Sequence, residues 1–147
     1  MVRVRRSTVL DVPADRAWSV LRDFNGFDRW HPAITSSEID RRAPGDQVGC
    51  VRRLRLADGA EVREQLITLS DLEQCLSYCL LETLMPLFNY VAHIRLVPVT
   101  DGDRTFWSWE GRFTTRRGEE AAMTRLVGEG IFEAGFSAIR EHLADAG

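Results

Sequence analysis

The chain has 147 residues, of which 44% are hydrophobic and 28% are charged, as in one globular domain that buries its own core. Its formal net charge of -3 supplies no basic field for nucleic acid, so we expect no nucleic-acid partner. No apolar run reaches the ~20 residues that span a bilayer, and the charged N-terminal stretch lacks the apolar core of a signal peptide. We therefore expect a cytoplasmic protein with no stable membrane insertion.

The reactive side chains exclude several chemistries. All 19 basic residues are arginines, so a Schiff-base mechanism has no lysine to use. The cysteines, Cys50, Cys75 and Cys79, form no CxxC pair, which argues against a disulfide framework and a structural zinc site. The sequence also lacks HExxH, GxGxxG, GxxxxGK[ST] and GxSxG motifs. We therefore expect reduced thiols, no metal and no cofactor.

The N-terminal half begins with a strand and a helical insertion. Residues 2–10 alternate as a strand does. Pro13 then opens a stretch in which Trp18 and Leu21 fall at helical spacing, and a short second helix and loop follow up to Pro32. Strand-like segments then cover residues 34–41, 49–56, 60–69, 74–82, 89–98 and 104–114.

The chain closes with one long helix from about Gly118. Its apolar residues form two lines, Met123, Val127, Ile131 and Ala134, and Phe132, Phe136, Ile139 and Leu143. Small residues interrupt these lines, among them Gly128, Gly130 and Gly135. They indicate either close packing on the sheet or room for a ligand beside the helix. This order of elements predicts a curved antiparallel sheet around a closing helix, which is a container for a small apolar molecule.

The turn at Ala57-Asp58-Gly59 sets the register of the central hairpin. If Gly59 takes the left-handed bulge position, Leu54 pairs with Val62 and Arg52 pairs with Glu64. The hairpin then separates into an apolar and a polar face, with Arg52 and Glu64 on the apolar, concave one. Two charges there must pair with each other or meet a polar group of a ligand, and both interpretations stay open.

The later strands place aromatic residues on the interior face. Tyr78, Tyr90 and Trp109 belong to this set, and each suits a pocket wall as well as a filled core. His31, between Trp30 and a proline, could act as a general acid or base, or could simply pack in its loop.

Three stretches resemble a known family: DVPADRAWSVLRDFNGFDRWHPAI; GCVRRLRLADGAEVREQLITLSD followed by Tyr78; and Pro98 with DGDRTFWSWEGRF. With the long final helix, they resemble the polyketide cyclase/dehydrase and lipid-transport group of the START-like (SRPBCC) superfamily. The resemblance implies one α+β domain over residues 1–147 with a helix-grip fold. In that fold a seven-stranded antiparallel sheet wraps around a long C-terminal helix, and two short helices follow the first strand.

The resemblance also implies a deep cavity for a hydrophobic ligand. Carried over by position, the ligand-binding candidates are Trp30, Pro32, Arg52, Glu64, Tyr78, Tyr90, Trp109 and Phe132. Relatives that close and dehydrate polyketide chains polarise them with pocket side chains, and the catalytic candidates here are His31, Arg52 and Tyr78.

Three functions follow as hypotheses. The leading one is binding of a small hydrophobic ligand, lipid-like or polyketide-like, by a monomer or homodimer. The second is a polyketide cyclase, aromatase or dehydratase that works by acid-base chemistry in the same cavity, although no catalytic signature identifies an enzyme. The third is a protein-interaction module, which an exposed apolar patch would mark.

Overall fold

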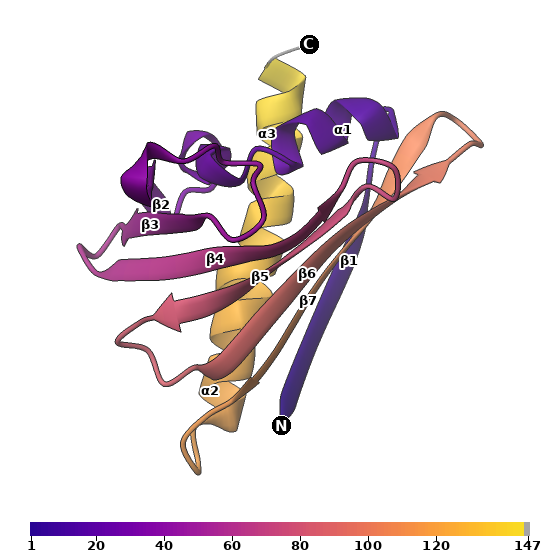
Figure 1. The fold of residues 1–147 in the computed structure, drawn as a ribbon. Coiled ribbons are helices and arrows are strands. Elements are labelled where there is room, and N and C mark those ends of the chain that lie inside the picture. The colour runs from indigo at the N-terminus through magenta and orange to yellow at the C-terminus, as the bar shows by residue number, and fades with distance from the viewer. Residues whose placement is uncertain (146–147) are drawn as a thin grey trace.

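The structure is a computed structural model and describes residues 1–145. Its centre is one seven-stranded antiparallel sheet in the spatial order β1-β7-β6-β5-β4-β3-β2 (Figure 1). The strands are β1 (Val2–Leu10), β2 (Ile34–Ile39), β3 (Val51–Leu56), β4 (Glu61–Ser70), β5 (Cys75–Glu82), β6 (Phe88–Val99) and β7 (Arg104–Thr114). The first strand therefore pairs with the last, and every other neighbour in the sheet is also a neighbour in the chain.

The two helices after the first strand and the C-terminal helix lie where the sequence predicts them, while the short turn after β2 and the π-helical part of the C-terminal helix were not predicted. Helix α1 (Ala14–Leu21) and the 3₁₀ helix η1 (Phe24–Arg29) follow the first strand, and a short 3₁₀ turn, η2 (Asp40–Arg42), follows β2. The C-terminal helix runs across the sheet (Figure 1). It consists of α2 (Glu120–Arg125), η3 (Leu126–Glu133) and α3 (Ala134–Asp145). Its middle part, η3, is a π-helix, which the periodicity of the sequence does not predict. The expected α+β helix-grip fold is confirmed.

The central hairpin adopts the predicted bulged turn. Gly59 has a φ of +90°, which a residue with a Cβ rarely adopts. The Leu56 N–H donates to the Ala60 carbonyl at 2.8 Å. The register then pairs Leu54 with Val62 and Arg52 with Glu64, as predicted. Arg52 and Glu64 are consequently next to each other on the side of the sheet that faces the C-terminal helix.

The core lies between the sheet and that helix. Trp109 on β7, which the sequence placed on the interior face, is buried there, as are the helix residues of the second apolar line. Gly135 allows the helix to approach closely, because a Cβ at this position would come within 2.8 Å of Trp109 Cζ3. A Cβ at Gly130 would meet nothing closer than the Leu126 Cδ1 atom at 3.6 Å. Each explanation of the small residues therefore holds at a different position, close packing at Gly135 and open space at Gly130.

Within residues 1–145, no helix combines the length and the apolar character that crossing a bilayer requires.

Candidate functional site

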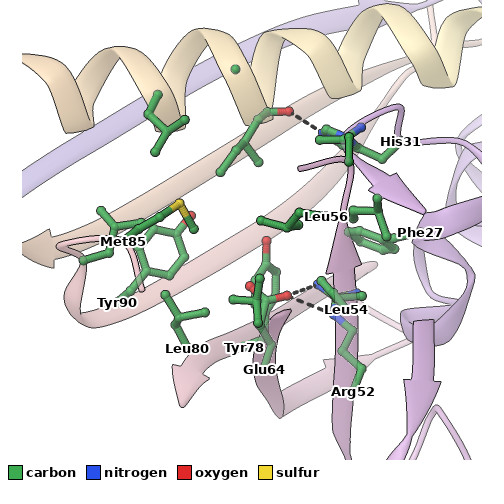
Figure 2. A pocket seen from close by; sticks show the side chains of 18 of the residues that line it. Phe27, His31, Arg52, Leu54, Leu56, Glu64, Tyr78, Leu80, Met85 and Tyr90 are labelled. Atoms are coloured by element: carbon green, nitrogen blue, oxygen red, sulfur yellow. Dashed lines mark hydrogen bonds and ion pairs between the residues drawn. The ribbon is translucent and has the colours of Figure 1, made fainter. Parts of the chain in front are cut away.

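A cavity of about 310 Å³ lies between the sheet and the C-terminal helix. The sheet contributes inward-facing residues of β3, β4, β5 and β6, and the helix contributes residues of its π-helical part (Figure 2). Most of the wall is apolar, with the side chains of Leu54, Leu56, Val62, Leu80, Met85 and Leu87. The polar side chains on the wall are His31, Arg52, Asp58, Glu64, Tyr78 and Tyr90.

The charged pair at the wall is an internal ion pair. The Arg52 side chain is only 1% exposed, and its Nε and Nη2 atoms donate to Glu64 Oε1 at 3.0 and 2.7 Å. Nη1 donates to the Phe24 carbonyl at 2.6 Å. The guanidinium also lies over the rings of Phe24 and Phe27, at 3.8 and 4.2 Å from their centroids. Arg52 is thus held on several sides by the protein itself, as the salt-bridge interpretation predicted.

Glu64, unlike Arg52, has a polar side-chain atom that residues 1–145 of the protein do not use. Both of its hydrogen bonds from Arg52 end on Oε1. Within the described residues, Oε2 has no hydrogen-bond donor from the protein. A carboxylate oxygen only accepts hydrogen bonds, so this side of Glu64 offers an acceptor to whatever occupies the cavity.

Two phenol groups lie near this acceptor. The Trp109 Nε1–H donates to the Tyr78 hydroxyl oxygen at 3.2 Å. Burial raises the pKa of Tyr78, and the neighbouring negative charge of Glu64 raises it further. Burial raises the pKa of Tyr90 as well, with further contributions from Tyr78 and Glu64. Both phenols are therefore neutral at physiological pH and keep an O–H that can donate.

His31 is buried, and both of its ring nitrogens are engaged. Nε2 lies 2.8 Å from the Ile131 carbonyl, which can only accept, so Nε2 carries the proton. Nδ1 accepts from the Ala33 N–H at 3.2 Å, so this nitrogen is unprotonated. Burial lowers the pKa of His31; the bond to Ile131 opposes this change and the charge of Arg52 adds to it. His31 is therefore a neutral side chain that fastens its loop to the π-helical segment, and its lone pair is already used.

The state of His31 makes stability depend on pH. Because the folded state lowers its pKa below the ordinary value of about 6.5, the unfolded chain takes up the proton more readily. The contribution of His31 to the free energy of unfolding is then fully present above about pH 6.5, and it is lost as the pH decreases below that value. We expect His31→Gln to cost about 1–2 kcal/mol at pH 7 and to flatten this dependence. Urea unfolding from pH 5 to 7.5 measures it.

The exposed His93 supplies the matched control for this prediction. His93→Gln should keep the pH dependence of the wild type. An unchanged slope in His31→Gln would contradict the assignment.

Several predicted residues line the cavity together. They are Arg52, Glu64, Tyr78, Tyr90, Trp109 and the catalytic candidate His31. They come from an early loop and from five different strands, β3 to β7, and the helix-grip topology brings them to one space.

Three of the predicted ligand-binding residues lie elsewhere. Trp30 is buried in the core against Trp107, with ring centroids 6.3 Å apart. Phe132 stacks on Trp109 with a centroid distance of 4.6 Å and lies behind the wall. Pro32 is exposed at the surface. We therefore leave Trp30, Pro32 and Phe132 out of the site.

The wall also includes residues outside the set of predicted ligand-binding candidates. Met85 and Leu87 belong to the connection between β5 and β6, while Leu126, Gly130 and Ile131 belong to the π-helical part of the C-terminal helix. The connection reads Thr-Leu-Met-Pro-Leu, which is more apolar than a solvent-exposed loop requires. This apolar composition is the feature of the sequence that could have indicated that the connection lines the cavity.

A curved antiparallel sheet, a C-terminal helix across it and a cavity between them define the helix-grip class of proteins. The family model described as polyketide cyclase / dehydrase and lipid transport matches residues 1–144, so the chain belongs to this family. A search of curated proteins finds no match.

Solved structures agree with this assignment over nearly the whole chain. The protein XoxI from Bacillus cereus is 25% identical with a TM-score of 0.87, and the match covers 99% of this chain and 98% of that one. A protein from Nitrosospira multiformis is 28% identical with a TM-score of 0.81, covering 97% and 96%. Norcoclaurine synthase from Thalictrum flavum, solved with dopamine and hydroxybenzaldehyde, is 17% identical with a TM-score of 0.78, covering 99% and 88%. This last similarity concerns the fold alone.

Proposed function

We propose that the protein binds a small, mainly apolar molecule in the cavity between the sheet and the C-terminal helix. The observation that carries this proposal is an apolar space of about 310 Å³ that the side chains leave open. Small-molecule sites occupy about 300–1,000 Å³ and combine an apolar wall with a few polar groups. The cavity lies at the compact end of this range, which favours a ring system or a short chain over a long lipid.

The family and the fold support this proposal. The family description includes both polyketide conversion and lipid transport, and both involve predominantly apolar molecules. Norcoclaurine synthase has the same fold and was solved with two small aromatic compounds. A lipid-like or polyketide-like ligand in the same place is consistent with these relatives.

The alternative, a cyclase, aromatase or dehydratase, receives less support from the geometry. His31, the candidate base, has both ring nitrogens in hydrogen bonds to the backbone. Arg52 directs three of its donor nitrogens to Glu64 and to the Phe24 carbonyl. His31 cannot engage a substrate without giving up an internal bond, and three internal bonds hold Arg52 in place, so binding is the function that the site supports best.

Filling the cavity tests the proposal. We expect the neutral dye N-phenyl-1-naphthylamine to bind the wild type saturably, with enhanced fluorescence. Leu80→Trp places an indole in the space that Leu80 lines, and it should weaken dye binding by about tenfold or more. Leu80 is only partly buried, so the larger side chain should cost about 1–3 kcal/mol and leave the protein folded.

Leu84→Trp is the matched control, since Leu84 is 89% exposed and does not line the cavity. This variant should bind the dye as the wild type does. Equal binding by the two variants, with equal circular dichroism spectra, would place the dye elsewhere and contradict the proposal.

A further inference from the structure

The inward-facing polar atoms of the cavity gather on neighbouring strands. Glu64 on β4 and Tyr78 on β5 occupy adjacent inward positions, because Tyr78 pairs with Leu66 and Glu64 pairs with Leu80. In Figure 2, Glu64 and Tyr78 lie next to each other, with Leu80 and Tyr90 also directed toward this space. One part of an otherwise apolar wall therefore carries polar side chains.

This polar part presents an acceptor rather than a cation. Arg52 is 1% exposed and is already bonded to Glu64 Oε1 and to the Phe24 carbonyl. Glu64 and Tyr78 both line the cavity, and because Arg52 uses Oε1 of Glu64, the other oxygen is the one left to accept a hydrogen bond from a ligand. Since the Tyr78 oxygen accepts from Trp109, its own O–H remains able to donate. The two groups together match a partner that both donates and accepts.

The charge of the site narrows the ligand class further. The guanidinium of Arg52 lies 2.7 Å from the Glu64 carboxylate, so the pair as a whole is neutral. A ligand ammonium would be buried with no net counter-charge, and a ligand carboxylate would in addition face the free oxygen of Glu64. A neutral hydroxyl meets neither penalty. It can donate to Glu64 Oε2 and accept from Tyr78.

We propose that the cavity selects apolar molecules that carry a neutral hydroxyl group, an alcohol or a phenol. In this proposal Glu64 Oε2 accepts a hydrogen bond from that hydroxyl. The inference rests on the proposed binding function and specifies its ligand. Glu64 is then the specificity-determining residue, and Arg52 positions its carboxylate.

A series of naphthalene derivatives tests the inference on the wild-type protein. The probes are 2-naphthol, 2-methoxynaphthalene and 2-naphthoate, each measured by its displacement of N-phenyl-1-naphthylamine at pH 7. The ether keeps the oxygen and the ring system but cannot donate. We expect 2-naphthol to bind about tenfold or more tightly than the ether, and 2-naphthoate to bind most weakly. Equal binding of 2-naphthol and the ether, or tightest binding of 2-naphthoate, would overturn the inference.

A pair of variants assigns the effect to Glu64. Glu64→Gln removes the charge and leaves Arg52 without its anionic partner. The advantage of 2-naphthol over the ether should shrink to about twofold, and 2-naphthoate should bind more tightly than to the wild type. Glu61→Gln is the matched control, because Glu61 lies on the same strand, pairs with Arg55 and is 53% exposed. It should leave the whole series unchanged. An unchanged preference in Glu64→Gln would overturn the role of Glu64.

The inference and the proposed function fail in different ways. If the dye does not bind the wild type, the binding function itself is wrong, and the inference falls with it. If the dye binds and the three probes displace it without the expected order, only the hydroxyl selectivity is wrong. Should Glu64→Gln not fold, the wild-type series with the ether still decides.

Discussion

Replacing Arg52 with methionine is expected to lower the free energy of unfolding by about 3–5 kcal/mol. The substitution leaves the carboxylate of Glu64, whose side chain is 12% exposed, without the cation that neutralises it. It also removes the donor to the Phe24 carbonyl. Breaking one side of a buried pair is costly because the remaining charge has lost both water and partner. Urea unfolding followed by tryptophan fluorescence measures the change.

A second substitution separates the charge effect from the loss of packing. In Arg52→Met/Glu64→Leu no charge remains, and we expect most of the lost stability to return, since apolar replacements of buried pairs are often near neutral. Arg53→Met, on the outer face of the same strand, is the control. Its guanidinium pairs with Asp40 and its side chain is 48% exposed, so we expect a loss of less than about 1 kcal/mol. A double variant no more stable than Arg52→Met would show that packing dominates.

The register that brings Arg52 to Glu64 could be predicted from the sequence because local chemistry sets it. Gly59 supplies the left-handed turn position, and only one turn length separates the apolar from the polar residues of the hairpin. The order of strands and helices and the inward face of each strand follow from the same kind of local pattern. These features depend on neighbours in the chain or on directly paired strands.

The wall of the cavity could be predicted only in part, because periodicity tells which way a side chain faces and not how deeply it packs. Trp109 and Phe132 both point inward, yet they stack on each other, and only Trp109 reaches the open space. The same limit applies to the role of His31. Its hydrogen bond to the Ile131 carbonyl joins residues 100 positions apart and depends on the path of the π-helix.

The second large loss of stability is expected at Trp109, which is part of the core and also lines the cavity. Trp109→Ala is expected to lower the free energy of unfolding by about 3–5 kcal/mol. The indole is 1% exposed and stacks on Phe132 and Trp107, with centroid distances of 4.6 and 5.5 Å. Its removal also takes away the Nε1–H that donates a hydrogen bond to the Tyr78 hydroxyl oxygen. Thermal and urea unfolding, with circular dichroism to establish the fold, measure the loss.

The strand that carries Trp109 also carries its control. Phe106 lies on β7 but faces outward and is 37% exposed, so Phe106→Ala should cost no more than about 1 kcal/mol. Trp109→Phe should lie between the two, because a phenyl ring keeps part of the stacking and loses the N–H. Since Trp109 lines the cavity, its truncation joins the new void to the existing space. Trp109→Ala should therefore bind larger ring systems than the wild type does. Equal losses from Trp109→Ala and Phe106→Ala would contradict this account of the core.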